Sequence, residues 1–309
     1  MDFESNTKTL KFDERYGAIV WITAKSLFKK NIGDIYEAIT QVLEASEISF
    51  YGCCFGRYDL VLEFAHKSPR VASRYACEIQ DAILKVSNGS FGPCCCSLTL
   101  YRKVHLPMFR PSYFKKSTNK GKRNALRAYV FLKFGPKNLE GSSNLFSTYL
   151  RDKAGVDLLW NTSTYNFILA IDGKCLHRIF STIFEFKRQF RGVVYETSTF
   201  FAVRWDNARN TFSQDEPEII KGVKKLIPAI VYVKLKQFSD LPLVNIPDDW
   251  LPMFGMKNFQ FRRPGWLDEC LFTKKRSAAE IKSAVYRLRK LNKNFISSTS
   301  TILLFPVAS

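Results

Sequence analysis

The chain has 309 residues, 46% of them hydrophobic and 15% aromatic, which suffices for two or three domains with buried cores and excludes a wholly disordered protein. Its net charge is +19, and residues 106–309 contribute +18 of it, against +1 from residues 1–105. Such an imbalance attracts polyanions, either nucleic acid or an acidic membrane face, and we predict a nucleic-acid partner and no membrane partner.

The N-terminal sequence MDFESNTKTLKFDE is charged from its second residue and lacks the apolar segment of a secretory signal. No apolar run approaches the roughly 18 residues that a membrane-spanning helix needs. We therefore expect a cytoplasmic protein, with association with the nucleoid as one form of that location.

Five of the eight cysteines form two clusters, Cys53-Cys54 and Cys94-Cys95-Cys96. Without a secretory context they are expected to be reduced thiols. Adjacent cysteines on a strand point to opposite faces, and the two clusters are expected on strands at opposite edges of one sheet. We therefore predict packing roles for them and no metal site.

Three strand-like stretches open alike, AIVWITAK at 18–25, AYVFLKFG at 128–135 and AIVYVKLK at 229–236. Some 35 residues after each start comes a second similar phrase, FGRYDLVLEF at 55–64, STYNFILAI at 163–171 and GWLDECLF at 265–272. The first strands begin 110 and 101 residues apart, and the second phrase follows each of them at a nearly constant distance. Both features therefore recur with nearly the same period, which indicates an internal repeat. Each repeat ends in another strand, at 94–104, 195–205 and 297–307.

Helical patterns lie between these strands. Ser68-Pro69 is an N-cap followed by proline at the first helical position, and Ser277 with Glu280 forms a capping box. The residues expected to face the core at helical spacing are Ile32, Ile35, Ile39 and Leu43; Val71, Tyr75, Ile79 and Ile83; Leu176, Ile179, Phe180, Ile183 and Phe184; and Ile281, Val285, Leu288 and Leu291.

The order of elements predicts an α+β protein of three tandem ferredoxin-like βαββαβ units with antiparallel sheets, of the ACT-like or dimeric α+β barrel type. The units are placed at 1–105, 127–206 and 227–309, joined by a basic linker at 106–126 and a second linker at 207–226. Each sheet would leave one face bare, so the sheets are expected to pack on one another or on another chain. The third unit is diverged, because prolines interrupt the stretch where its first helix belongs, SDLPLVNIPDDWLPMFGM.

The sequences G-x-Y-D-L-V-L, from Gly56, and GVVYETSTFFAV, from Gly192, occur in this order along the chain. They resemble the ligand-sensing RAM domain of the Lrp/AsnC transcription regulators. The resemblance implies a sensing and oligomerisation role with an amino-acid-like effector bound near the G-x-Y-D turn. The residues carried over are Gly56, Tyr58, Asp59, Tyr165, Asn166, Thr197 and Thr199. Only some fifteen residues precede the first strand, so the helix-turn-helix of those regulators is not expected.

Basic residues are concentrated in two segments. The stretch 102–127 holds nine basic residues and no acidic one, with aromatic residues interspersed, and residues 274–293 hold a second cluster. The candidate nucleic-acid contacts are Lys115, Lys116, Lys120, Lys122, Arg123, Lys274, Lys275, Arg276, Arg287, Arg289 and Lys290.

No P-loop, nucleophile elbow or zinc-protease motif is found, so we predict a non-enzyme without a cofactor. The expected function is an Lrp/AsnC-like regulatory or scaffold protein, associated with nucleic acid through its basic segments, and the resemblance favours DNA over RNA as the partner. An RNA-recognition module is one alternative, since Trp21, Phe131 and Tyr232 recur in the first strands. Another alternative is an assembly subunit of a larger complex, which joins a homo-oligomer or a protein complex through the open sheet faces.

Overall fold

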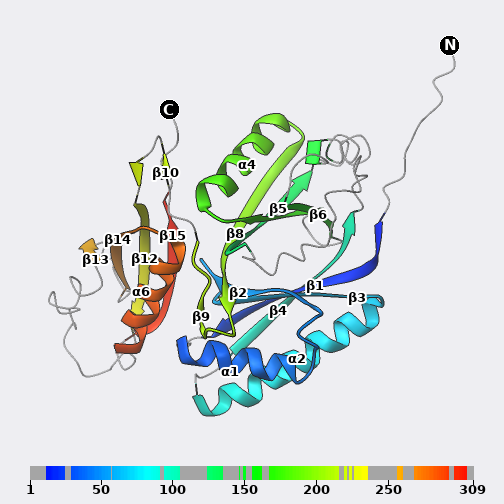
Figure 1. The fold of residues 1–309 in the computed structure, drawn as a ribbon, viewed down its shortest axis with the longest axis horizontal. Coiled ribbons are helices and arrows are strands. Elements are labelled where there is room, and N and C mark those ends of the chain that lie inside the picture. The colour runs from blue at the N-terminus through cyan, green and yellow to red at the C-terminus, as the bar shows by residue number, and fades with distance from the viewer. Residues whose placement is uncertain are drawn as a thin grey trace.

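A computed structural model describes residues 12–24, 29–56, 58–90, 94–104, 124–134, 146, 149–150, 155–161, 167–215, 219–220, 223–224, 226–235, 256–259, 268–291 and 296–304. These residues form an α+β protein with antiparallel sheets, which confirms the predicted fold class at that level (Figure 1). Within this described part, no helix is both long and apolar enough to cross a membrane.

Eight strands close into a barrel in the order β2-β3-β1-β4-β6-β7-β5-β8, because β8 pairs again with β2. The strands are β1 (Phe12–Ala24), β2 (Ile48–Cys54), β3 (Leu60–His66), β4 (Cys94–Val104), β5 (Leu126–Phe134), β6 (Val156–Trp160), β7 (Phe167–Gly173) and β8 (Val194–Asp206), and the short β9 (Thr211–Phe212) pairs antiparallel with the end of β8. The two seams are β4–β6 and β2–β8, and a sheet closed in this way keeps no free edge among these eight strands.

Helices cover the outside of the barrel. They are α1 (Lys29–Thr40), α2 (Pro69–Ser90) and α4 (Leu176–Gln189). The predicted stripe of α1 is confirmed, since Ile32, Ile35 and Ile39 are fully buried. The Ser68 hydroxyl accepts a long bond, 3.5 Å, from the amide of Val71 at the start of α2.

Alternation along each strand divides the side chains between two apolar layers. Val20 and Ile22 of β1 point outward to the helices, whereas Ile19 and Trp21 point into the lumen of the barrel. All four are almost completely buried. Burial on both faces explains why these strands read as continuous apolar runs rather than as alternating patterns.

Two glycines permit the close packing of the barrel. A Cβ at Gly17 would overlap the ring of Tyr101, its cross-strand neighbour, so the missing side chain leaves room for that ring across the lumen. A Cβ at Gly52 would overlap the carbonyl oxygen of Val203 at the β2–β8 seam. Gly52 therefore allows the closure of the barrel.

A separate four-stranded sheet, which we call the C-terminal sheet, has the order β13-β14-β12-β15. Its strands are β12 (Ile227–Leu235), β13 (Met256–Phe259), β14 (Asp268–Lys275) and β15 (Ile296–Leu303), and β10 (Ile219–Ile220) pairs with β11 (Val223–Lys224) before it. Helix α6 (Ala278–Leu291) covers one face of this sheet, at the left in Figure 1.

Helix α6 packs in two directions. Val285 and Leu288 belong to the core of the C-terminal sheet, whereas Ile281 and Tyr286 belong to the outer core of the barrel. The helix begins with the predicted Ser277 cap, whose hydroxyl accepts a bond from the Glu280 amide at 3.2 Å.

Two core assignments from helical spacing are wrong. Phe184 on α4 is 53% exposed and Leu291 at the end of α6 is 58% exposed. Each stands at the edge of its apolar stripe, where the spacing alone does not decide burial. The proline-containing stretch expected in place of a helix, 239–255, lies outside the described residues.

Candidate functional site in the barrel lumen

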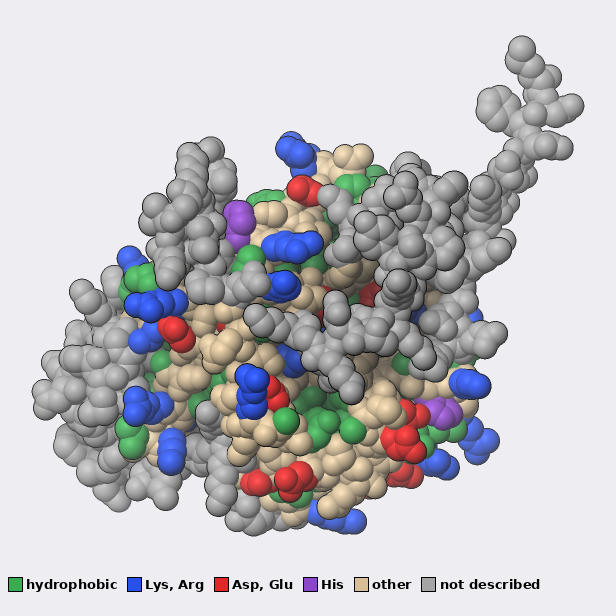
Figure 2. Space-filling model, viewed as in Figure 1, with side chains coloured by type: hydrophobic (Ala, Val, Ile, Leu, Met, Phe, Trp, Pro, Cys, Tyr) green, Lys and Arg blue, Asp and Glu red, His purple; other side chains and the backbone are tan. Residues whose placement is uncertain are grey.

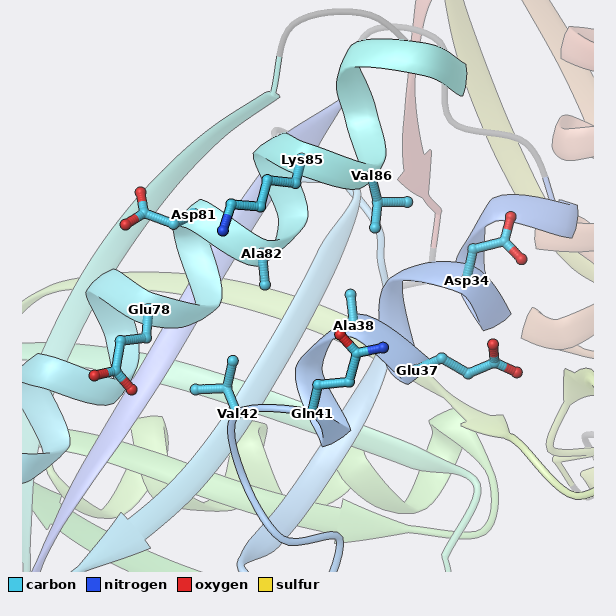
Figure 3. A pocket seen from close by; sticks show the side chains of 10 residues that line it. All are labelled: Asp34, Glu37, Ala38, Gln41, Val42, Glu78, Asp81, Ala82, Lys85 and Val86. Carbon is cyan, nitrogen blue, oxygen red and sulfur yellow. The ribbon is translucent and has the colours of Figure 1, made fainter.

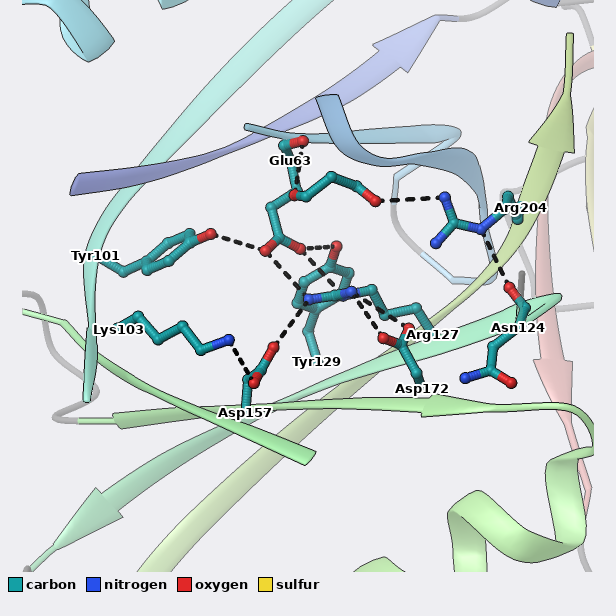
Figure 4. Close-up of polar contacts among 10 residues, drawn as sticks. Glu63, Tyr101, Lys103, Asn124, Arg127, Tyr129, Asp157, Asp172 and Arg204 are labelled. Carbon is teal, nitrogen blue, oxygen red and sulfur yellow. Dashed lines mark hydrogen bonds and ion pairs between the residues drawn. The ribbon is translucent and has the colours of Figure 1, made fainter. Parts of the chain in front are cut away.

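A buried ionic network crosses the middle of the lumen (Figure 4). The carboxylate of Glu63 on β3 accepts the phenol hydrogens of Tyr101 and Tyr129, both at 2.7 Å. It also pairs with the Arg127 guanidinium, through Nε at 3.0 Å and Nη2 at 3.1 Å. One buried carboxylate therefore joins strands β3, β4 and β5, which come from distant parts of the sequence.

The network continues from Arg127 toward solvent. Its Nη1 bonds to the two oxygens of Asp172 at 3.1 and 3.2 Å, and its Nη2 lies 4.0 Å from Asp157. Asp157 in turn pairs with Lys103 at 2.7 Å, and both of these side chains are more than one third exposed. The network thus runs from the buried pair in the middle of the lumen to a solvent-exposed pair at one end of it.

Burial and mutual charge shift these groups. Burial raises the pKa of Tyr101 and Tyr129 well above its ordinary value, and the negative charge of Glu63 raises it further. Burial alone would lower the pKa of Arg127, but the attraction of Glu63, with Tyr129 and Asp172, outweighs it and the net pKa is raised. Both tyrosines therefore stay neutral donors, and Arg127 stays charged.

Aromatic rings close the other end of the lumen, where β1 and β5 approach their last residues. We call the group Trp21, Tyr58, Phe131 and Phe200 the aromatic mouth. The Trp21 ring lies 5.1 Å from Tyr58, 5.3 Å from Phe200 and 6.0 Å from Phe131, measured between centroids. Its indole N–H donates to Thr99 Oγ1 at 3.1 Å. Tyr58 and Phe200 are only partly buried, so the mouth presents ring surface to solvent.

Hydroxyl groups stand beside the aromatic mouth. Ser97 is the cross-strand partner of Trp21, and Ser198 is that of Phe131. Ser97 is exposed and Ser198 is partly exposed. The arrangement can hold a planar apolar molecule by ring contacts and offer it hydrogen bonds at the rim.

The turn between β2 and β3 holds three of the predicted effector residues. Gly56 has φ of +96°, as a glycine at this turn allows. The Asp59 carboxylate accepts the Ala24 amide at 2.9 Å and the Arg289 guanidinium at 3.0 Å. Asp59, one of the residues predicted to bind an effector, is therefore engaged by the chain's own backbone and by helix α6.

The structure does not bring the predicted effector residues together. Tyr58 faces the lumen, whereas Thr197 and Thr199 of β8 lie on the opposite, helix-covered side of their strand, since Ser198 and Phe200 face inward. Tyr165 and Asn166 are outside the described residues.

The residues predicted to contact nucleic acid differ in their exposure to solvent. Lys115, Lys116, Lys120, Lys122 and Arg123 lie outside the described residues, whereas Lys274, Arg276, Arg287 and Lys290 are exposed and Lys275 is partly exposed. Figure 2 shows basic side chains over the region of α6. Arg289 does not belong to this surface, because it is 4% exposed and paired with Asp59.

Cys53 and Cys54 point to opposite layers, as their adjacency predicted. Cys53 lies in the outer core and Cys54 in the lumen core. Burial raises the pKa of Cys53 to about 12, although Lys282 and the Tyr286 hydroxyl lower it somewhat. Within the described residues, no three histidine, cysteine or acidic side chains gather as metal ligands would.

A groove of about 660 Å³ lies between helices α1 and α2 on the outside of the barrel (Figure 3). Acidic side chains line it from both helices: Asp34, Glu37, Glu78 and Asp81, with Lys85 as a basic member. Sequence reasoning missed this groove, because the four acids stand on the solvent sides of two helices that the linear pattern does not place side by side.

Sequence reasoning also missed the Glu63–Arg127 network. Its one signal was a charged residue within each of two apolar strands, Glu63 in LVLEFAH and Arg127 in LRAYVFLKF. A charge at such a position needs a partner, but the sequence does not say which one.

Comparison with known proteins finds likeness at the level of structure. No protein-family model matches the sequence, and no curated protein gives a significant match. A chlorite dismutase variant from Candidatus Nitrospira defluvii, in complex with cyanide, matches at 11% identity and a TM-score of 0.42, over 68% of this chain and 98% of that chain. A candidate chlorite dismutase matches at 8% identity and a TM-score of 0.45, over 63% and 97%. A candidate monooxygenase from Lactobacillus acidophilus NCFM matches at 10% identity and a TM-score of 0.42, over 65% and 97%.

These findings correct the predicted family and function. The solved structures found are chlorite dismutases and a candidate monooxygenase rather than Lrp/AsnC regulators, so the RAM-domain assignment is wrong. The predicted non-enzymatic regulatory or scaffold role and the DNA-binding and transcription keywords are wrong for the same reason, whereas the predicted partners of the chain stay predictions. At this identity and these TM-scores, the likeness does not carry the activity of those proteins to this chain.

Proposed function

We propose that the barrel binds a small, planar, largely apolar molecule at the aromatic mouth. The observation that supports this is the convergence of four rings, of which Trp21 is 2% exposed while Tyr58 and Phe200 remain partly open to solvent. Partly exposed ring surface with a few hydroxyl groups beside it is a common lining of small-molecule sites.

The chemistry of the rim sets the class of ligand. The indole N–H of Trp21 donates a hydrogen bond to Thr99, which fixes the orientation of the ring. Ser97 and Ser198 offer hydroxyls, and two residues further along β5 and β8 Lys133 pairs with Glu196 at 3.7 Å. An aromatic ring with one polar substituent fits these surroundings better than a highly charged ligand does.

The ionic network supports entry from one end only. Glu63 and Arg127 occupy the middle of the lumen with side chains 4% and 6% exposed. Opening this region would separate a buried ion pair, which costs several kcal/mol. The ligand is therefore expected to contact Tyr58 and Phe200 without reaching Arg127.

We also propose that the chain contains three copies of one unit, at 12–104, 126–206 and 227–303. The pairing register supports this, since Trp21 stands opposite Ser97, Phe131 opposite Ser198 and Tyr232 opposite Ser300. In each case an aromatic of the first strand faces a serine of the last. The first two copies supply the barrel, and the third supplies the C-terminal sheet.

The binding proposal is tested by ¹⁹F NMR with 5-fluoroindole as the probe and the full chain as the receptor. We expect saturable broadening of the probe signal, and a dissociation constant that rises about three- to tenfold in Phe200→Ala and in Tyr58→Ala. Phe184→Ala is the matched control, because Phe184 is an exposed aromatic on the outer helix α4.

Equal affinity in the Phe200→Ala, Tyr58→Ala and Phe184→Ala variants would place the probe elsewhere and overturn the assignment of the mouth. An absence of saturable binding by the unmodified chain would overturn the proposed class of ligand.

A further inference from the structure

The Thr99 hydroxyl lies against the central ring of the aromatic mouth. Its Oγ1 is 3.1 Å from the indole Nε1 of Trp21, and this contact is partly buried. Trp21 is 2% exposed, and its ring packs against those of Tyr58, Phe131 and Phe200. A molecule that packs against these rings therefore comes close to the Thr99 hydroxyl.

The pairing of the strands places Thr99 on the lumen side of β4. Thr99 is the cross-strand partner of Ile19, and Tyr101, two residues further along β4, reaches Glu63 in the middle of the lumen. Side chains two residues apart on a strand share a face, so Ser97, Thr99 and Tyr101 form one row along the wall of the lumen. Ser97 is exposed, Thr99 is partly exposed and Tyr101 is buried. Thr99 therefore lies between the buried lumen and its solvent-exposed rim.

The bond to Trp21 determines the hydrogen-bonding role of the Thr99 hydroxyl. An indole N–H can only donate, so Thr99 Oγ1 must accept, and the hydroxyl hydrogen of Thr99 points elsewhere. Among the residues that the structure describes, the Thr99 hydroxyl has no other hydrogen-bond partner. Its hydrogen is therefore available to an acceptor atom on a bound molecule.

The two serines at the rim do not impose such a choice. In the described part of the chain neither Ser97 nor Ser198 forms a side-chain hydrogen bond, so each hydroxyl can donate or accept. A ligand N–H could use the second lone pair of Thr99 Oγ1, but the hydroxyl hydrogen would then be left without an acceptor. Thr99 is thus the rim residue that discriminates between an acceptor and a donor on the ligand.

We propose that the aromatic mouth selects planar aromatic molecules that carry a neutral hydrogen-bond acceptor, a carbonyl oxygen or a ring nitrogen, and that Thr99 donates to this acceptor. The inference rests on the proposed binding function of the mouth. A neutral acceptor fits better than a carboxylate, because Lys133, two residues beyond Phe131 on β5, is already paired with Glu196. Burying a carboxylate without a cation costs more than one hydrogen bond contributes.

The test compares two fluorinated probes with the full chain by ¹⁹F NMR. 5-Fluoroindole offers an N–H donor, whereas 6-fluoroquinoline, a planar two-ring molecule of similar size, offers a ring-nitrogen acceptor and no donor. We expect the unmodified chain to bind 6-fluoroquinoline about three- to tenfold more tightly, which is the effect of one neutral hydrogen bond. Thr99→Val removes the hydroxyl at nearly the same shape and should abolish this preference, whereas Thr99→Ser keeps the hydroxyl and should retain it.

Thr199→Val is the matched control, because Thr199 lies on the helix-covered side of β8 and should leave the preference unchanged. The preference is a ratio of two dissociation constants. A change in the orientation of Trp21 in Thr99→Val, which would weaken both probes alike, therefore does not alter it.

The outcomes separate this inference from the proposed function. Saturable binding of both probes with equal affinity by the unmodified chain would overturn the role of Thr99 and leave the mouth as a binding site. A preference that persists in Thr99→Val would also overturn it, because another group would then donate to the ring nitrogen. Failure of both probes to bind the unmodified chain would overturn the proposed function and this inference together.

Discussion

Removing the Arg127 guanidinium tests whether the lumen network stabilises the barrel as a buried unit. In Arg127→Met the aliphatic part of the side chain is kept, but Glu63 loses contacts at 3.0 and 3.1 Å and Asp172 loses contacts at 3.1 and 3.2 Å. The Glu63 side chain is only 4% exposed, so water cannot replace the lost partner. Breaking such a pair from one side costs about 3–5 kcal/mol, which lowers the Tm of a domain of this size by roughly 6–20 °C.

The assay is urea unfolding followed by tryptophan fluorescence, with Lys103→Met as the matched control. The Lys103–Asp157 pair is shorter than the Glu63–Arg127 pair, at 2.7 Å, but its side chains are 40% and 36% exposed. A solvated pair contributes about 0.2–1 kcal/mol. If Arg127→Met lost no more unfolding free energy than Lys103→Met, burial would not govern this network and the reasoning would fail.

The double variant Glu63→Gln with Arg127→Met separates the pair interaction from the effects of the single changes. In the single Arg127→Met variant a buried carboxylate is left without its cation, and in the double variant that charge is absent. We expect the double variant to lose less stability than the sum of the two single losses, by about 1–3 kcal/mol. A strictly additive result would mean that Glu63 and Arg127 stabilise the barrel independently.

Three further outcomes are expected. Gly52→Val should lower the free energy of unfolding by more than about 2 kcal/mol, because its side chain would overlap the Val203 carbonyl at the seam. Gly56→Ala should lower the free energy of unfolding only through the strain of its positive φ, and urea titration of both variants measures the difference. Asp215→Ala should cost about 1–2 kcal/mol in the same assay, since the carboxylate accepts the Ala278 and Ala279 amides at the start of α6 at 2.8 and 3.1 Å, and an unchanged stability would remove Asp215 as the cap of that helix. Iodoacetamide at mildly alkaline pH should modify the exposed Cys77 and Cys95 and spare Cys53, whose pKa of about 12 leaves it protonated; mass spectrometry of the labelled peptides would contradict this if Cys53 reacted as fast.

The predicted elements that agree with the structure are those specified by local signals. The stripe of Ile32, Ile35 and Ile39 and the Ser277 cap each depend on residues within about one or two turns of each other, and both are found as expected. The burial of Phe184 and Leu291 was predicted wrongly. Both residues have the right helical spacing, but they stand at the edge of the covered surface, where burial depends on which other element packs against the helix.

The closure of the barrel could not be read from the chain. The β2–β8 seam pairs Gly52 with Arg204, and the β4–β6 seam pairs Arg102 with Trp160, so each joins segments far apart in sequence. A strand with both faces buried looks the same whether its second face meets a lumen or another chain. The open faces were therefore predicted as contact surfaces, but which sheet met which was not determined by periodicity.

The Lrp/AsnC resemblance failed for a related reason. The sequence G-x-Y-D supplies a turn with positive φ and a carboxylate at a strand entry, and both have structural uses. Here Asp59 holds the Ala24 amide and the Arg289 guanidinium, so a turn of that composition serves to attach helix α6. The motif specified local geometry rather than a ligand.

The same turn connects the aromatic mouth with the C-terminal sheet. Gly56 accepts a hydrogen bond from Ser300 of β15, Tyr58 contributes its ring to the aromatic mouth, and Asp59 pairs with Arg289 on α6. A displacement of α6 or of the C-terminal sheet would therefore be transmitted to Tyr58 along this turn. Asp59→Asn weakens the attachment of α6 and should change the affinity of the aromatic mouth for 5-fluoroindole, whereas Lys103→Met at the far end of the lumen should leave that affinity unchanged. Equal affinity in the two variants would contradict this connection.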